Sequence, residues 1–183
     1  FLYKSNNNFK LYPENVFRQI KIRDTLNIGF EGLIAKVIKK NEKFISLKCI
    51  SAGLLENNKG VHLENREINL DFITPKDLKC IELAKKNRIN NFALSFTNST
   101  KDIEKFKKLL PTQRRIFKIE TLPAVKNIKS FFRKENNFLI DRGDLSKSIG
   151  IENIPIAQRK ILAQARKKSS VKIAIATNFL ESM

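Results

Sequence analysis

The second half of the sequence alternates between short apolar runs and longer segments with helical spacing, and this alternation constrains the fold most strongly. Short apolar runs separated by helices are typical of parallel strands that are buried on both faces in an α/β protein. The sequence therefore predicts a parallel α/β fold from about residue 74 onward. The four predicted strands are NNFALSF (90–96), RIFKIE (115–120), NNFLIDRGD (136–144) and VKIAIAT (171–177).

Helix-start signals occur in the segments between these runs. Thr74 is a predicted N-cap with Pro75 in the first helical position, and Asn153 is a predicted N-cap with Pro155 close behind it. Residues at helical spacing then define an inner side for each helix. The predicted helices and inner residues are 74–88 with Leu78, Ile81, Leu83 and Ala84; 98–110 with Ile103, Phe106 and Leu110; 121–132 with Val125, Ile128 and Phe132; and 152–168.

The first part of the chain has a different pattern. FRQIKI (17–22) alternates as a strand does, and the runs GLIAKVI and KFISLKCI are expected to form a hairpin around Asn41 and Glu42. The loop SAGLLENNKG (51–60) follows them. We therefore expect a small β module over residues 1–60 and an α/β domain over residues 61–183.

Two of the predicted strands end in charged residues. Lys118 and Glu120 are two apart in a strand, so their side chains share one side while Ile119 faces the other. Asp144 follows the end of the next strand, and its carboxylate is expected to approach that of Glu120. A hard divalent cation such as Mg²⁺ would neutralise two converging carboxylates, and Gly143 would let the backbone approach a ligand closely.

A simpler interpretation of these strand ends is also open. Lys118 with Glu120, and Arg142 with Asp144, would then form ordinary ion pairs. The strands are followed by neither a Gly-x-Gly-x-x-Gly motif nor a Walker-type lysine loop, which argues against a dinucleotide-type fold. Polar residues at the carboxyl ends of successive strands are typical of the active sites of (β/α)8 barrels, so part of a barrel fits better.

Composition excludes some classes of function. The net charge is +18 with a pI near 10.1. The lysines are spread thinly and do not form one stripe, which indicates a basic solvated surface more than a nucleic-acid-binding face. There is no apolar stretch of membrane-spanning length, and Cys49 and Cys80 are expected to be reduced thiols. The sequence starts at Phe1 and has its only methionine at Met183, so we expect a segment of a longer product.

Several stretches of the sequence carry a family resemblance. FKIETLPAVKNI, IDRGDLSKSIGIENIPIAQRKI and IAIATNFLESM resemble pyruvate kinase, in the family's order and at its spacings. GFEGLIAKVI, ENNKGVHLENREINL, ITPKDLKCIELA and FALSF extend the similarity toward the N-terminus. The resemblance implies a partial (β/α)8 TIM barrel over residues 61–183, preceded by part of the family's small all-β lid domain over residues 1–60.

The resemblance also implies functional residues. Lys118 and Thr177 correspond to catalytic residues: the lysine neutralises the transferred phosphoryl group and the threonine assists protonation at carbon. Glu120 and Asp144 correspond to ligands of Mg²⁺ or Mn²⁺, and Gly143, Asp144 and Thr177 to substrate-binding residues. The family moves the phosphoryl group of phosphoenolpyruvate to ADP in glycolysis, giving pyruvate and ATP. It usually requires K⁺ and is typically a homotetramer. A cytoplasmic location is expected, or an organelle if the whole protein carries a transit peptide.

Departures from the family pattern leave a second hypothesis open. Asn98 replaces a family arginine, His62 and Glu64 occupy altered positions, and Asp141 lies where a small residue is usual. The extra carboxylate of Asp141 would either disturb the metal site or pair with Arg142. The barrel strands that carry another phosphoryl-binding arginine and part of the K⁺ site lie outside this sequence. The alternative is therefore a catalytically impaired paralogue that acts as a regulatory or assembly partner.

Overall fold

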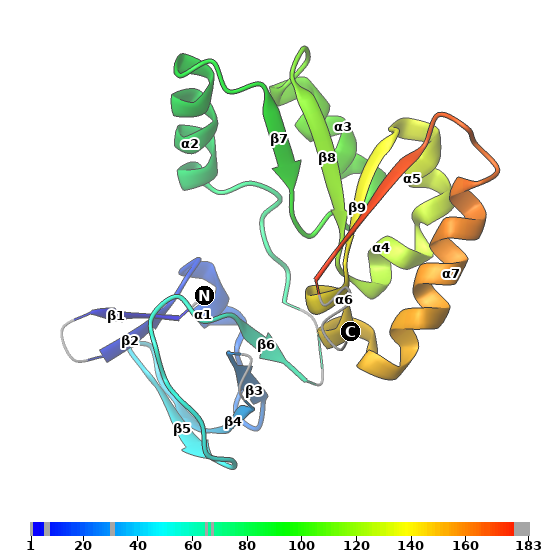
Figure 1. Ribbon diagram of the computed structural model, residues 1–183. Coiled ribbons are helices and arrows are strands. Elements are labelled where there is room, and N and C mark those ends of the chain that lie inside the picture. The colour runs from blue at the N-terminus through cyan, green and yellow to red at the C-terminus, as the bar shows by residue number, and fades with distance from the viewer. Residues whose placement is uncertain (1, 6–7, 30–31, 65, 67, 178–183) are drawn as a thin grey trace. The chain divides into compact units, whose positions relative to one another are not determined.

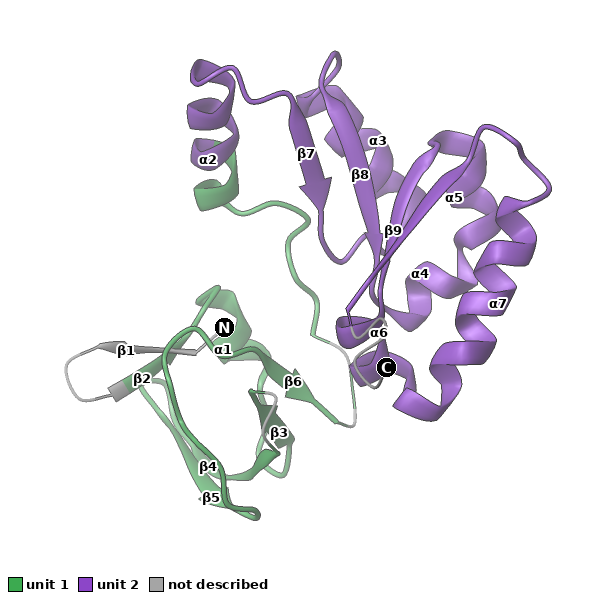
Figure 2. Ribbon diagram, viewed as in Figure 1, with its two compact units in different colours: residues 1–78 green, residues 79–183 purple. Residues whose placement is uncertain are grey.

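The computed structural model describes residues 2–5, 8–29, 32–64, 66 and 68–177. Its contacts divide the chain into two compact units, residues 1–78 and 79–183 (Figures 1 and 2). The elements of the first unit are β1 (Leu2–Ser5), β2 (Asn8–Leu11), α1 (Asn15–Gln19), β3 (Thr25–Ile28), β4 (Leu33–Lys40), β5 (Ile45–Cys49) and β6 (Val61–Leu63).

The first unit is built on an antiparallel sheet with the strand order β5-β4-β3-β6. The predicted hairpin is confirmed, because β4 and β5 pair on either side of the turn at residues 41–44. A separate hairpin joins β1 to β2. Apolar residues on one side of the sheet form the core of this unit together with α1, namely Val16, Ile20, Leu26, Ile28, Leu33, Ala35 and Val37.

Two features of this unit differ from the sequence-based expectation. The stretch 17–22 was predicted as a strand, and this is wrong because α1 covers Asn15–Gln19. Val16 and Ile20, one helical turn apart, are both buried, and this burial outweighs the alternation of the neighbouring residues. The division between the compact units falls after Leu78, later than the predicted division at residue 60. Strand β6 pairs with β3, and Arg66, Asn69 and Thr74 make hydrogen bonds to earlier residues of the first unit.

The second unit alternates strands with helices, as predicted. Helix α2 (Pro75–Lys86) leads into it across the division between the units. The remaining elements are β7 (Asn91–Leu94), α3 (Thr100–Leu109), β8 (Arg114–Ile119), α4 (Leu122–Lys126), α5 (Ile128–Lys134), β9 (Asn137–Asp141), α6 (Arg142–Ile149), a 3-10 turn (Ile151–Asn153), α7 (Ile154–Ala165) and β10 (Lys172–Ala176).

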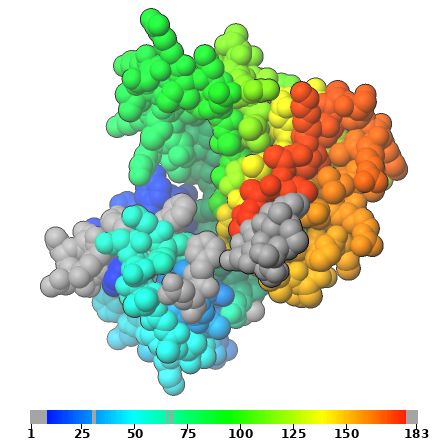
Figure 3. Space-filling model, viewed as in Figure 1, coloured from blue at the N-terminus to red at the C-terminus, as the bar shows by residue number. Residues whose placement is uncertain are grey.

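The sheet of the second unit is parallel and follows chain order, β7-β8-β9-β10. Because each crossover moves to the next strand in the same direction, right-handed connections place the crossover helices on one face. Helices α3, α5 and α7 pack side by side there, and α7 lies beside β10 (orange and red in Figure 3). In the described part of the chain, β7 and β10 each pair with a single neighbour, so both are edge strands.

Phenylalanines fill the space between this sheet and its helices. Phe117 of β8 lies edge-to-face with Phe106 of α3, with ring centroids 5.8 Å apart. Phe138 of β9 contacts the ring of Phe117 at 6.0 Å and those of Phe131 and Phe132 of α5 at 6.4 and 5.0 Å. All five side chains are buried. This burial confirms the predicted inner sides of α3 and of the helical segment after β8.

Other details of the second unit depart from prediction. The predicted single helix over residues 121–132 is two helices, because the chain breaks at Asn127, which ends α4 and begins α5. Helix α2 has the predicted Thr74 cap, but its predicted inner side is wrong, since none of its residues is buried and Leu83 is 62% exposed. Ile81 and Ala84 of that side are only partly buried. None of the described helices combines the length and hydropathy of a membrane span.

Candidate active site

Strand alternation separates the reactive side chains from the core of the second unit. On β8, Phe117 and Ile119 point into the core, so Lys118 and the following Glu120 point to the opposite side of the sheet. On β9, Phe138 and Ile140 point into the core, so Asp141 lies on that same opposite side. Ile119 pairs with Ile140 in the parallel register, which brings the carboxyl ends of β8 and β9 level.

Lys118 is held between two carboxylates. Its Nζ lies 2.5 Å from Glu120 Oε1 and 2.9 Å from Asp141 Oδ2. Burial lowers the pKa of this lysine, but the hydrogen bonds to Glu120 and Asp141 outweigh burial, so the pKa is raised above its ordinary value. Lys118 is therefore a charged ammonium group fixed at the end of β8.

Glu120 is the most deeply buried charged side chain of the site, with 1% exposure. Its Oε2 accepts a hydrogen bond of 2.5 Å from the backbone N–H of Phe96, which follows β7. Its Oε1 faces the Lys118 ammonium and accepts no other hydrogen bond from the described residues. Desolvation raises the pKa of Glu120, although Lys118 and the Phe96 N–H oppose that rise. The carboxylate thus keeps coordination capacity in a nearly dry environment.

Asp141 connects two strand ends across β9. One of its oxygens, Oδ2, faces Lys118, and the other, Oδ1, accepts a hydrogen bond of 2.9 Å from Thr177 Oγ1. Burial opposes ionisation of Asp141, but the bonds from Lys118 and Thr177 outweigh it and lower the pKa. Thr177 directly follows β10 and has a positive φ of 74°, a conformation that is uncommon for residues other than glycine.

Asp144 lies in the first turn of α6, where the positive end of the helix dipole favours a carboxylate. Its Oδ1 lies 3.1 Å from Lys147 Nζ, one turn later. Gly143 lies between Asp141 and Asp144 and packs closely on Thr177. A Cβ at position 143 would lie 3.0 Å from Thr177 Cγ2, so this contact requires a glycine or a shift of the threonine.

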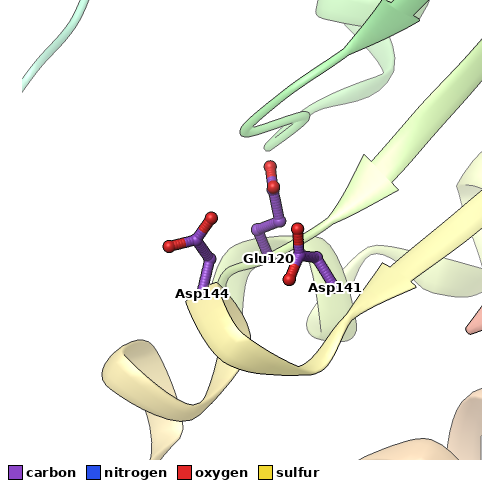
Figure 4. A group of neighbouring side chains, drawn as sticks. All are labelled: Glu120, Asp141 and Asp144. Carbon is purple, nitrogen blue, oxygen red and sulfur yellow. The ribbon is translucent and has the colours of Figure 1, made fainter. Parts of the chain in front are cut away.

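Three carboxylates converge on the same space above the strand ends. Figure 4 shows Glu120, Asp141 and Asp144 rising from the ends of β8 and β9 and from the start of α6. One oxygen of each lies within 4.8 Å of the others. Carboxylate oxygens are the ligands that Mg²⁺ and Mn²⁺ prefer, and a buried carboxylate with spare coordination capacity suits such an ion. The donor set therefore fits a hard divalent cation.

The structure brings together all the residues that the sequence marked for the site: Lys118, Glu120, Gly143, Asp144 and Thr177. Their chemical roles remain predictions. The ordinary ion pair between Lys118 and Glu120 is present as well, so that contact alone does not separate the two interpretations.

The partners of the other charged groups differ from the expected ones. Asp144 pairs with Lys147 and Asp141 with Lys118, where Arg142 was the anticipated partner of each. Sequence reasoning also missed the Phe96 N–H, because a backbone donor leaves no trace in residue type. The alternation of side chains along each strand would have placed Asp141 beside Lys118 if the register of β8 against β9 had been known.

Comparison with known proteins assigns the sequence to a family. The family model for the barrel domain of pyruvate kinase matches residues 3–183, nearly the whole chain. The chain belongs to the pyruvate kinase family. The resemblance inferred from the motifs is thereby confirmed, and the mixed α/β fold with a parallel sheet is the expected class for the barrel domain of this family.

Relatives from distant organisms support the same assignment. The pyruvate kinase of Methanocaldococcus jannaschii is 34% identical over 152 residues, which covers 81% of this chain and 34% of the relative. The pyruvate kinase of Chlamydia trachomatis is 28% identical over 178 residues, covering 94% of this chain and 36% of the relative. That of Thermotoga maritima is 27% identical over 170 residues, covering 91% and 36%. The chain thus spans about a third of the length of the curated relatives it matches.

Proposed function

We propose that this chain supplies part of the catalytic unit of a pyruvate kinase, which transfers the phosphoryl group of phosphoenolpyruvate to ADP to give pyruvate and ATP. The observation that carries the proposal is the convergence of Lys118 with Glu120 and Asp144 at the carboxyl ends of parallel strands. A basic group beside a hard-cation donor set suits the stabilisation of a transferring phosphoryl group, whose charge is spread over its oxygens.

The family resemblance implies a role for each residue in this proposal. Glu120 and Asp144 would hold Mg²⁺ or Mn²⁺, which when bound neutralises phosphate charge and orients the substrate. Lys118 offers its fixed ammonium to the phosphoryl oxygens while the P–O bond of phosphoenolpyruvate breaks and a bond forms to an ADP oxygen. Thr177 would turn its hydroxyl from Asp141 toward the enolate carbon, where it would assist the proton uptake that forms the methyl group of pyruvate. Gly143 keeps the turn close to Thr177.

The fold context belongs to the same proposal. A parallel sheet in chain order with its crossover helices on one face is the arrangement found in part of a (β/α)8 barrel. We infer that the second unit is a section of that barrel and that the first unit contains part of the family's lid domain, so that the boundary lies nearer Leu78 than residue 60. The requirement for K⁺, the homotetramer and the cytoplasmic location remain predictions.

The test is pyruvate formation from phosphoenolpyruvate and ADP with Mg²⁺, using the whole protein that contains this chain. Lys118→Met is expected to lower kcat by at least about a hundredfold, the usual cost of removing one preorganised charge-stabilising group. Lys108→Met removes the same charge from an exposed position on α3 and should leave kcat unchanged. Equal activity of the wild type and both variants would overturn the proposal.

One observation favours a second candidate function. Asp141 engages both Lys118 and Thr177, so neither proposed catalytic residue is free of a competing partner. A catalytically impaired paralogue that regulates or assembles with an active enzyme fits that observation. A folded whole protein that forms no pyruvate with Mg²⁺, Mn²⁺ and K⁺ present, but associates with an active pyruvate kinase, would establish this second function.

A further inference from the structure

Asp141 is the one residue of the site that touches both groups proposed to act on the substrate. It lies at the end of β9, the strand between β8 and β10, and its two oxygens reach in opposite directions. Oδ2 lies 2.9 Å from Lys118 Nζ at the end of β8, and Oδ1 accepts the Thr177 hydroxyl proton at 2.9 Å beyond β10. The ends of three neighbouring strands are thus tied together by one carboxylate.

This contact restricts both partners. The Lys118 ammonium already faces Glu120. A second carboxylate offsets its positive charge further and weakens its attraction for a phosphoryl oxygen. The Thr177 hydroxyl points its proton at Asp141 and must turn away before it can direct that proton toward a substrate. Gly143, whose missing Cβ leaves room for Thr177, keeps the threonine within reach of Asp141.

Asp141 also changes the charge balance of the site. Of the charged side chains joined by these contacts, Glu120, Asp141 and Asp144 are carboxylates, and Lys118 and Lys147 are ammonium groups. Asp141 therefore makes this cluster one charge more negative than it would be without it. An excess negative charge repels a free phosphate and attracts a divalent cation.

We propose that Asp141 is a positioning residue of this site that holds Lys118 and Thr177 in place and makes anion binding depend on prior binding of a divalent cation. The proposal rests on the function proposed above. Once a cation neutralises the carboxylates, Lys118 can exchange Asp141 for a phosphoryl oxygen. The order of binding would then be cation first and phosphoryl substrate second.

The test measures the affinities for a cation and for an anion, which a change of charge at Asp141 should alter in opposite directions. Mn²⁺ alone is titrated into the whole protein and followed by the paramagnetic resonance of free Mn²⁺, and inorganic phosphate is titrated calorimetrically with and without Mn²⁺. The wild type should bind phosphate only when Mn²⁺ is present. Asp141→Asn should weaken Mn²⁺ binding about tenfold, as loss of a residue supporting a metal site commonly does. It should also tighten metal-free phosphate binding by about threefold or more, even at the dielectric constant of water.

Two further variants separate charge from structure. Asp141→Ala removes the same charge without placing an amide beside Lys118, and it should shift both affinities in the same directions as Asp141→Asn. Glu82→Gln removes one negative charge from exposed α2 and should shift neither. A variant of Asp141 that lowers both affinities, or changes neither, would overturn the inference. A wild type that binds no Mn²⁺ would instead overturn the proposed function and this inference with it.

Discussion

Each unit of the chain contains a partly buried cluster of charged groups, and the two clusters are built differently. In the first unit, Asp24 accepts bonds at both oxygens: Arg66 Nη2 lies 2.6 Å from Oδ2 and Arg66 Nε 3.2 Å from Oδ1. The backbone N–H of Lys21 adds a third bond at 2.7 Å. The hydrogen bond from Arg66, above all, lowers the pKa of Asp24 below its ordinary value, against the opposing effect of burial.

Glu120 in the second unit has fewer donors and deeper burial. It faces one ammonium and one backbone N–H, and its pKa is raised, not lowered. The Asp24 carboxylate is satisfied by its own unit, which is what a purely structural ion pair requires. The Glu120 carboxylate is under-satisfied, which is unfavourable for folding unless a ligand completes it. The difference teaches that the number of donors facing a buried carboxylate separates a structural one from one available for binding.

The largest effect should come from removing the charge partner of Glu120. Lys118→Met leaves Glu120 and Asp141 without their shared ammonium, and it should reduce the free energy of unfolding by about 3 kcal/mol at pH 8. In the variant the pKa of Glu120 rises further above the unfolded value. The folded state then binds a proton more readily, and the loss should shrink as pH falls toward the ordinary range of a glutamate.

Urea denaturation at several pH values measures this effect. The double variant Lys118→Met/Glu120→Gln is the control, because it removes the buried charge along with its partner and should recover much of the loss at pH 8. The contrary result would be a loss of unfolding free energy in Lys118→Met that does not depend on pH and is equally large in the double variant. The lysine would then act through packing alone, and the contrast with Asp24 would disappear.

Local sequence signals account for much of the fold. Thr74 caps α2 as predicted, because a cap depends on residues within one turn. Asn153 stands at the predicted start of α7, but its side chain makes no cap hydrogen bond. Lys118 and Glu120 lie on the same side because side chains two residues apart in a strand point the same way, which is also a local property of the sequence. The inner side of α3 was also predictable, since Ile103 and Phe106 have the spacing of one helical face and a sheet to cover.

What sequence could not supply depends on distant partners. Helix α2 carries an equally good cap and apolar residues, yet it buries none of them, because burial requires an element that covers it. The contact between Asp141 and Lys118 depends on how β9 registers against β8, and no local pattern encodes that. Asp141 therefore appeared in the sequence only as a departure from the family that would either disturb the metal site or pair with Arg142, and its contact with Lys118 was not foreseen.

A smaller effect is expected at the structural ion pair of the first unit. Arg66→Met removes two side-chain bonds to Asp24 and should reduce the free energy of unfolding by about 1–2 kcal/mol at pH 7. Because the pKa of Asp24 is lowered in the folded state, this contribution is complete above the ordinary aspartate pKa of about 3.9 and is lost as pH falls through the folded pKa. The loss shrinks as pH falls in both variants, but in different pH ranges: for Arg66→Met only below the ordinary aspartate pKa, and for Lys118→Met already above the ordinary glutamate pKa.

Denaturation midpoints of the wild type and Arg66→Met, compared from pH 7 down to pH 3, test this trend. Lys36→Met removes one positive charge from an exposed position of β4 and should change little across that range. If the difference between wild type and Arg66→Met grew toward low pH, Asp24 could not be the satisfied carboxylate that the comparison requires.

The smallest effect on stability is expected at an exposed ion pair whose nitrogen and oxygen atoms lie at hydrogen-bond distance. Lys134 Nζ lies 2.7 Å from Glu104 Oε1, between α5 and α3, but the two side chains are 50% and 49% exposed. Water screens such a pair and the ordering of two long side chains offsets its attraction, so Glu104→Gln should leave the denaturation midpoint at pH 7 unchanged within error. A shift as large as that of Arg66→Met would mean that contact distance, and not burial, sets the strength of these pairs. The distinction between Asp24 and Glu120 would then have to rest on ligand binding alone.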